Sequence, residues 1–294
     1  MQTKQDGFTG AAVRLFKAEK ALVLAGLLGF ALAALCAVWV LLYGGPVGPD
    51  GDVSKAFSFN AAIGIFLLST AMILPSSGLG RKGKTTFRTV YVLLALFSYF
   101  AETTQNFRGA NPRFLKDGAS AYDIAIGAVF GLVALLLVVF YLFLAARYFF
   151  PKVYKQNPVW VLSIRYAMIA VMLSFAAGIW ISMHQGRYVG SHGNLIWLHG
   201  LGFHGLQALP FVAWLTGRAA MDVPARRALV HLSGAAYALG LVAIGWQTML
   251  GQAVLSWSYL TFAAAGCFLL ALVPVALILL RRPVRRPEAA SFRS

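Results

Sequence analysis

Two histidines and a glutamine stand close together in the segment WLHGLGFHGLQALP, residues 197–210. Neutral imidazoles bind zinc, iron or copper, and a histidine can be the axial ligand of a haem. At 100° per residue along a helix, His204 and Gln207 share a face, whereas His199 and His204 lie about 140° apart. A straight helix therefore cannot offer both histidines to one metal ion or haem, and another ligand would have to come from elsewhere in the chain.

A second group of polar side chains lies in and after the segment 87–106. Glu102 and Gln105 are about one helical turn apart, Arg108 follows closely, and Asp123 opens the next apolar run. A carboxylate beside imidazoles suits a metal ion, and a series of carboxylates and histidines suits proton transfer inside a membrane. Two structural interpretations compete with these: Glu102 could pair with Arg108, and Asp123 could stabilise a helix N-terminus.

Burying polar groups of either set against lipid would cost several kcal/mol, so each needs a partner. We therefore expect both sets to converge in one polar pocket in the outer half of a bundle of membrane helices. Its predicted members are Glu102, Gln105, Arg108, Asp123, His199, His204 and Gln207. Within this set, His199, His204 and Glu102 are the candidate metal ligands, and the cofactors that fit are a metal ion or haem b. No residue is identified as catalytic, and the sequence leaves open whether the protein is an enzyme.

The same residues carry a resemblance to a known group of proteins. Glu102-Thr-Thr-Gln105 leads to Arg108-Gly109 and then to Asp123, and HGLGFHGLQALP, residues 199–210, follows later in the chain. This pattern, Glu-x-x-Gln…Arg-Gly…Asp with His-x4-His-x-x-Gln-x-x-Pro, resembles an uncharacterised family of bacterial polytopic membrane proteins. The likeness covers roughly residues 85–215. It implies that these residues belong to one site, and it implies no particular activity.

The elements that position these residues are predicted to be membrane helices. The chain is 60% hydrophobic and only 12% charged, against about 25% charged residues in soluble domains. Its apolar runs approach the roughly 20 residues that a membrane-spanning helix needs, and they lack the alternation of a membrane barrel. The eight predicted spans are 21–43, 57–74, 87–106, 122–146, 159–183, 195–217, 228–250 and 257–280. We therefore expect an all-α fold, with one transmembrane bundle over residues 1–280 and a basic tail over 281–294.

The distribution of positive charge predicts the orientation of this bundle. Of the 25 lysines and arginines, 19 fall in alternate connecting segments, beginning with the N-terminal one. Because cytoplasmic segments are enriched in Lys and Arg, both termini are predicted to be cytoplasmic. The net charge of +16 is spread over segments that flank apolar runs, which argues against nucleic-acid binding. The expected location is the bacterial inner membrane, which the chain crosses several times, with the lipid bilayer as its partner.

The glycines of the histidine segment also match a dinucleotide-binding fingerprint, Gly200-x-Gly202-x-x-Gly205. That fingerprint needs a preceding strand and an acidic residue about 20 positions later in a βαβ unit, and neither is found here. Inside a membrane helix, glycines instead allow close packing of neighbouring helices. The sequence shows no convincing internal repeat, although an even number of spans permits a division into four and four.

Three functions remain in competition. The first is a metal- or haem-linked redox protein of the membrane. The second is a proton-coupled transporter of a small molecule, with carboxylates and histidines as the relay. The third is a lipid-facing sensor or assembly protein in which the polar residues only hold helices together. A small-molecule ligand fits the first two, and the oligomeric state is not indicated.

The predicted topology can be tested with reporter fusions in the connecting segments. Fusions expected to report the outside are those at Ser54, Gly118 and Ser191. Fusions expected to report the cytoplasm are those at Gly83, Gln156 and Pro224. A seven-span pattern, with the two termini on opposite sides, would contradict the prediction.

Overall fold

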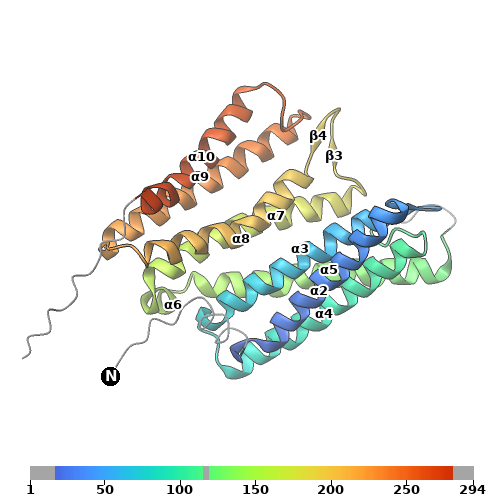
Figure 1. Ribbon diagram of the computed structural model, residues 1–294, viewed down its shortest axis with the longest axis horizontal. Coiled ribbons are helices and arrows are strands. Elements are labelled where there is room, and N and C mark those ends of the chain that lie inside the picture. The colour runs from blue at the N-terminus through green and yellow to red at the C-terminus, as the bar shows by residue number, and fades with distance from the viewer. Residues whose placement is uncertain (1–16, 115–118, 281–294) are drawn as a thin grey trace, which may run out of the picture. The chain divides into compact units, whose positions relative to one another are not determined.

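A computed structural model describes residues 17–114 and 119–280, and this part of the chain is almost entirely helical (Figure 1). The basic tail predicted for 281–294 lies outside the described residues. The α-helices of the described part are α2 (Lys20–Tyr43), α3 (Val53–Ile73), α4 (Arg81–Phe107), α5 (Ala121–Tyr148), α6 (Pro151–Gln156), α7 (Pro158–Met183), α8 (Ile196–Thr216), α9 (Val223–Met249) and α10 (Tyr259–Leu280). The strands are β1 (Pro46–Val47), β2 (Gly51–Asp52), β3 (Tyr188–Val189) and β4 (Gly193–Asn194), and a short 3-10 helix, η1, covers Leu74–Ser76.

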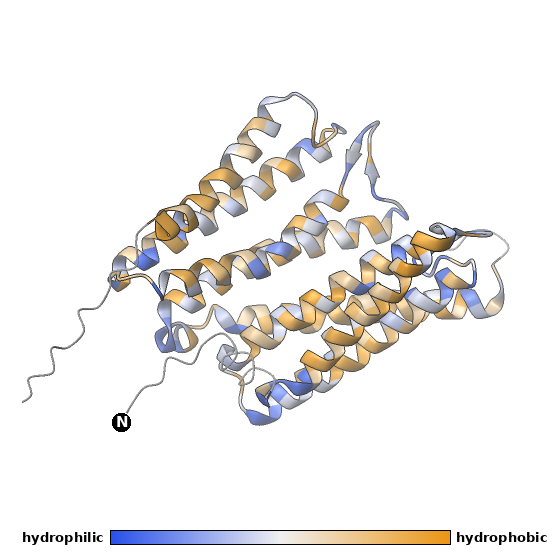
Figure 2. Cartoon of the chain, in the orientation of Figure 1, coloured by the Kyte–Doolittle hydropathy of each residue, from blue (hydrophilic) through white to orange (hydrophobic). Residues whose placement is uncertain are grey.

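Each of the eight predicted apolar runs is a helix in the structure, which confirms the all-α fold. Within the described chain, six segments are long and apolar enough to cross a membrane: α2, α3 with η1, α5, α7, α9 and α10. Figure 2 shows apolar residues along these helices and hydrophilic residues mostly near their ends. The protein thus has the helices of a multi-pass membrane protein. The two long helices below this threshold, α4 and α8, are those that carry most of the candidate site residues.

The contacts of the chain group it into two compact units. The first holds α2 to α5 and the part of α7 from Phe175 onward. The second holds the part of α7 up to Ser174 together with α8, α9 and α10. The single bundle over residues 1–280 stays a prediction.

In the first unit, small residues and buried aromatic rings hold the helices together. A side chain at Gly26 of α2 would lie 2.9 Å from the carbonyl oxygen of Gly64 in α3, and the reverse also holds, so the two backbones are in contact. Phe66 packs against Tyr141 with ring centroids 4.6 Å apart. The buried phenol of Tyr148 donates to the backbone carbonyl of Ile73 at 2.7 Å, which satisfies its polar atom.

In the second unit, the glycine segment of α8 packs against α7, which confirms the predicted close packing for two of its three glycines. A Cβ at Gly202 would lie 2.7 Å from the carbonyl oxygen of Ala170, and one at Gly205 would lie 2.6 Å from the Ala170 methyl group. A Cβ at Gly200 would meet nothing within 4 Å. The phenol of Tyr237 donates to the carbonyl of Leu201 at 2.7 Å and fastens α9 to α8.

The two halves of the chain repeat the same order of elements. The order α2–β1–β2–α3–α4–α5 recurs as α7–β3–β4–α8–α9–α10. The strands pair antiparallel in the same register, and positions 46 and 52 correspond to positions 188 and 194, a shift of 142 residues. Helices α4 and α9 begin at 81 and 223 and end at 107 and 249, which is the same shift. The prediction that the chain has no internal repeat was therefore wrong.

The contacts around the hairpin also repeat. The backbone N–H of Asp50 donates to the carbonyl of Gly109 at 2.8 Å, and that of His192 donates to the carbonyl of Gly251 at 3.0 Å. Both of these glycines follow the end of a helix with positive φ, 80° and 73°, a conformation that glycine adopts most readily. The end of each unit at which these contacts occur is called its hairpin end.

The repeat is hard to recognise in the sequence because few residues are identical at corresponding positions of the two halves. The hairpins read Val47-Gly-Pro-Asp-Gly51-Asp and Val189-Gly-Ser-His-Gly193-Asn. A Cβ at Gly51 would clash with the backbone oxygen of Asn106, near the end of the third helix of the first repeat. A Cβ at Gly193 would clash in the same way with Thr248, near the end of the third helix of the second repeat. The helices between them have diverged, since any apolar side chain of suitable volume can face lipid or fill a helix contact.

Two substitutions in α8 test the close contact with α7. Gly202→Ala should destabilise the protein by about 1–3 kcal/mol, because the added methyl group overlaps Ala170 and Ser174. Gly200→Ala is the matched control in the same helix, and it should leave stability unchanged or slightly raised because its methyl group meets open space. Thermal unfolding of the detergent-purified variants measures the difference. Equal melting temperatures for the two variants would contradict the packing.

Candidate functional site

The carboxylate of Glu102 is buried near the hairpin end of α4, with 1% of the residue exposed. Arg113 forms an ion pair with it: the guanidinium Nη2 donates to Oε1, and Nε donates to Oε2 at 3.1 Å. The side-chain amide of Asn106 donates to the same Oε1 at 3.3 Å. The partner of Glu102 is therefore Arg113 and not Arg108. Arg113 lies in the loop after α4, and no spacing in the sequence marked it.

The other polar residues of this group form a separate network that joins α4 to α5. The amide of Gln105 donates to Oδ1 of Asp123 at 2.8 Å, and Arg108 donates to the same oxygen at 3.1 Å. Ser120 is the N-cap of α5, where its hydroxyl accepts from the backbone N–H of Asp123 and donates to Oδ2 at 2.6 Å. Asp123 thus stabilises the N-terminus of α5 from its first turn, while Ser120 is the cap itself.

The second repeat contains the same network without charge. Gln247 lies 142 positions after Gln105 and donates to the hydroxyl of Thr261 at 3.0 Å. Ser258 caps α10 as Ser120 caps α5, and its hydroxyl accepts from the backbone N–H of Thr261 at 3.1 Å. A glutamine near the end of the third helix thus binds the first turn of the fourth helix in both repeats. Gln105 and Asp123 therefore belong to the scaffold of the repeat.

The ion pair of Glu102 and Arg113 has no such counterpart. The position 142 residues after Glu102 is Ile244, and the segment between α9 and α10 contains no lysine or arginine. A buried carboxylate is costly to keep, and a scaffold that holds with isoleucine at the equivalent place does not require it. The duplication therefore separates a shared structural network from a charged pair that is particular to the first repeat.

Polar groups continue from Glu102 into the interior of the first unit. Tyr99 lies nearly one turn before Glu102 on the buried face of α4, and the amide of Asn60 in α3 donates to the hydroxyl of Thr103 at 2.9 Å. The Asn60 carbonyl oxygen and the Tyr99 hydroxyl are buried without a protein partner among the described residues. Buried polar atoms of this kind are places where internal water binds. Buried polar groups thus occur on the same helix as Glu102 and on α3, which packs against it.

The histidine group belongs to the second unit and has two different environments. His199 is half-buried, and its Nδ1 lies 2.8 Å from the backbone oxygen of Ser174, which ties α8 to α7. His204 is exposed, and its Nδ1 lies 3.2 Å from the amide oxygen of Gln207, one turn further on. The prediction that His204 and Gln207 share a face is confirmed. The counterparts of the two histidines in the first repeat are Phe57 and Ala62.

The structure brings the predicted site residues together in two sets and does not support the predicted metal site. Glu102, Gln105, Arg108 and Asp123 belong to the first unit, and His199, His204 and Gln207 belong to the second. Within residues 17–114 and 119–280, no three His, Cys, Asp or Glu side chains are grouped so that they could hold a metal ion. The metal set of His199, His204 and Glu102 therefore gains no support from the described residues. The single pocket stays a prediction.

Comparison with known proteins assigns the chain to no family. No family model, no curated protein and no solved structure matches it. The resemblance of its motifs to a family of bacterial polytopic membrane proteins stays a prediction.

Two arginine substitutions compare the buried pair with the network at the helix cap. Removing one partner of a buried ion pair costs about 3–5 kcal/mol of stability. Arg113→Gln should cost an amount near the lower end of this range, because the arginine side chain is 32% exposed. Arg108→Gln should cost about 0–1 kcal/mol, because the Arg108 side chain is 45% exposed and screened by solvent.

The double variant Glu102→Gln, Arg113→Gln should recover most of the stability lost in Arg113→Gln, since no unpaired charge stays buried. Thermal unfolding in detergent measures all three variants. Equal losses of stability for the two single arginine variants would show that the Glu102–Arg113 pair is no more buried than the pair of Arg108 and Asp123.

Proposed function

We propose that the protein is a proton-coupled carrier of a small molecule in the bacterial cytoplasmic membrane. The observation that carries the proposal is the duplication, in which each repeat has four long helices and the same hairpin. Internal repeats are typical of secondary transporters. If α4 and α8 cross the membrane as well, the chain has eight spans. Four spans per repeat would give both repeats the same orientation and leave both termini on the same side of the membrane, which the distribution of Lys and Arg predicts to be the cytoplasm.

Glu102 is the proposed coupling group. Ionisable side chains inside membrane proteins are costly, and they commonly mark proton and substrate pathways. While Glu102 is charged, it occupies the guanidinium of Arg113. Protonation removes the charge of the Glu102 carboxyl group, so the guanidinium of Arg113 can bind another anion. A proton on Glu102 and an anion on Arg113 would then be bound together, which couples their movement.

This arrangement favours a small organic anion as the substrate. A guanidinium offers paired N–H donors that match a carboxylate. About a third of the Arg113 side chain is exposed, so a solute can reach part of it. A redox function that depends on a bound metal ion gains no support here, because no three His, Cys, Asp or Glu side chains of the described residues are grouped as metal ligands.

The proposal predicts that carboxylate gradients drive proton movement. Purified protein would be reconstituted into vesicles that contain a pH-sensitive dye, and inward gradients of small carboxylates, sugars or amines would be imposed in turn. A carboxylate gradient should acidify the vesicle interior with the wild-type protein. With Glu102→Gln, radiolabelled carboxylate should still exchange while the proton movement is lost, because the amide cannot release a proton. Arg108→Gln is the control and should behave as the wild type.

Two results would contradict the carrier. One is the absence of any carboxylate-driven proton movement in vesicles, when a thermal unfolding measurement shows that the protein in them is folded. The other is a haem absorption band, or a metal in stoichiometric amount, in the purified protein. That second result would favour the redox function.

A further inference from the structure

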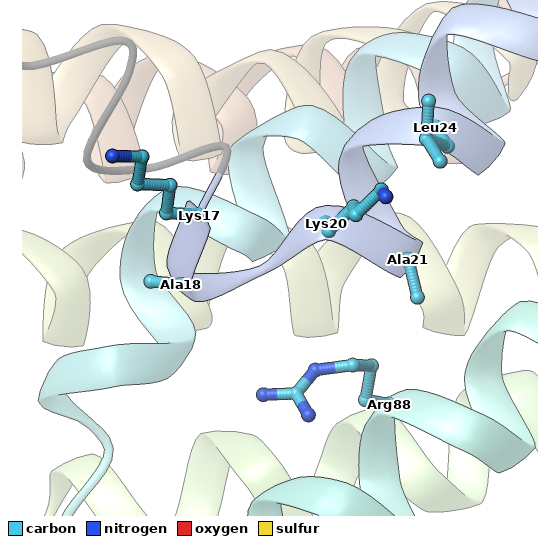
Figure 3. Close-up of a pocket in the computed structure, with 6 residues that line it drawn as sticks. All are labelled: Lys17, Ala18, Lys20, Ala21, Leu24 and Arg88. Atoms are coloured by element: carbon cyan, nitrogen blue, oxygen red, sulfur yellow. The ribbon is translucent and has the colours of Figure 1, made fainter.

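A pocket with a basic rim lies at the start of α2, at the end of the first unit opposite its hairpin end. Its volume is about 420 Å³. Figure 3 shows its lining residues, Lys17, Ala18, Lys20, Ala21, Leu24 and Arg88. Three of these side chains are cationic, and the others are apolar. The pocket is separate from the Glu102 site, which lies at the hairpin end of the same helices.

The positive charge of this pocket is only partly compensated. Arg88 of α4 makes two hydrogen bonds to the carboxylate of Glu19, at 2.7 and 3.0 Å, and Glu19 is only 2% exposed. Among the described residues, Lys17 and Lys20 have no acidic side chain within ion-pair distance. They lie beside the N-terminus of α2, where the helix dipole disfavours cations. An anion in the pocket would relieve both the mutual repulsion and this unfavourable placement.

The apolar wall indicates which kind of anion fits. Ala21 and Leu24 continue from the basic rim along the apolar face of α2, and Leu24 is 47% exposed. Free phosphate would contact only the lysines and would leave the apolar side chains of Ala21 and Leu24 without a partner. A phospholipid places a phosphate at the level of the lysines and an acyl chain along the leucine. Basic pockets between membrane helices bind anionic headgroups in the same way.

We propose that Lys17, Lys20 and Arg88 bind the headgroup of an anionic phospholipid, with its acyl chain against Ala21 and Leu24. Glu19 positions Arg88, so the guanidinium lies at the rim of the pocket. The proposal does not depend on what the protein transports, because it concerns only the opposite end of the first unit.

Native mass spectrometry of the full-length protein in detergent tests the site with defined lipids. The probes are phosphatidylglycerol and phosphatidylcholine with the same acyl chains, and inorganic phosphate. The wild-type protein should retain phosphatidylglycerol in preference to phosphatidylcholine. The double variant Lys17→Gln, Lys20→Gln should bind phosphatidylglycerol at least about tenfold more weakly, since each lysine near an anionic headgroup contributes.

The matched control is the double variant Lys82→Gln, Lys84→Gln, which removes the same charge from the start of α4 and should bind as the wild type. Leu24→Asn should weaken lipid binding without changing the effect of phosphate, because only the lipid uses the apolar wall. Equal retention of phosphatidylglycerol by both double variants would overturn the proposal. So would complete displacement of the lipid by millimolar phosphate together with unchanged binding by Leu24→Asn, which would identify a simple anion site.

Discussion

The contact between a glycine hairpin and the glycine after the third helix fixes the hairpin end of each repeat. The hairpin leaves no room for a side chain at Gly51 or Gly193, because each glycine lies against the backbone at the end of the third helix. The N–H of the turn residue then bonds to the carbonyl of Gly109 or Gly251. This contact determines where the third helix ends. It thereby places the glutamine of that helix beside the N-terminus of the fourth, and Glu102 beside the loop that supplies Arg113.

The duplication gives a physical means of separating structure from function. Gln105 with Asp123 and Gln247 with Thr261 make the same bond between helices, once with charge and once without. A bond that persists when its charge is removed serves the fold. Glu102 is the reverse case, since its counterpart is Ile244 and the scaffold does not require a carboxylate there. Retaining a buried charge that the fold does not need is costly, and for this reason Glu102 is the coupling group of the proposed carrier.

The two ends of the first unit differ in how they hold their charge. At the hairpin end, Glu102 is buried under Arg113 and Asn106, so its carboxylate is surrounded by donors. At the opposite end, Glu19 is buried and bonded to Arg88, while Lys17 and Lys20 beside it are exposed. The first arrangement surrounds a carboxylate with donors, and the second leaves two lysines with no acidic partner among the described residues. Both rely on α4, whose polar residues make it less apolar than its neighbours.

The sequence by itself determined the helices, since long apolar runs without alternation can satisfy their backbone in lipid only as helices. It also determined that His204 and Gln207 share a face, because helical periodicity is local. Only the tertiary structure decided that Glu102 pairs with Arg113, because a loop residue can reach many places and its spacing indicates none. The repeat likewise emerged only in the structure. The few glycines and glutamines that the two repeats share are constrained by contacts between distant segments. The apolar residues that fill the helices are interchangeable.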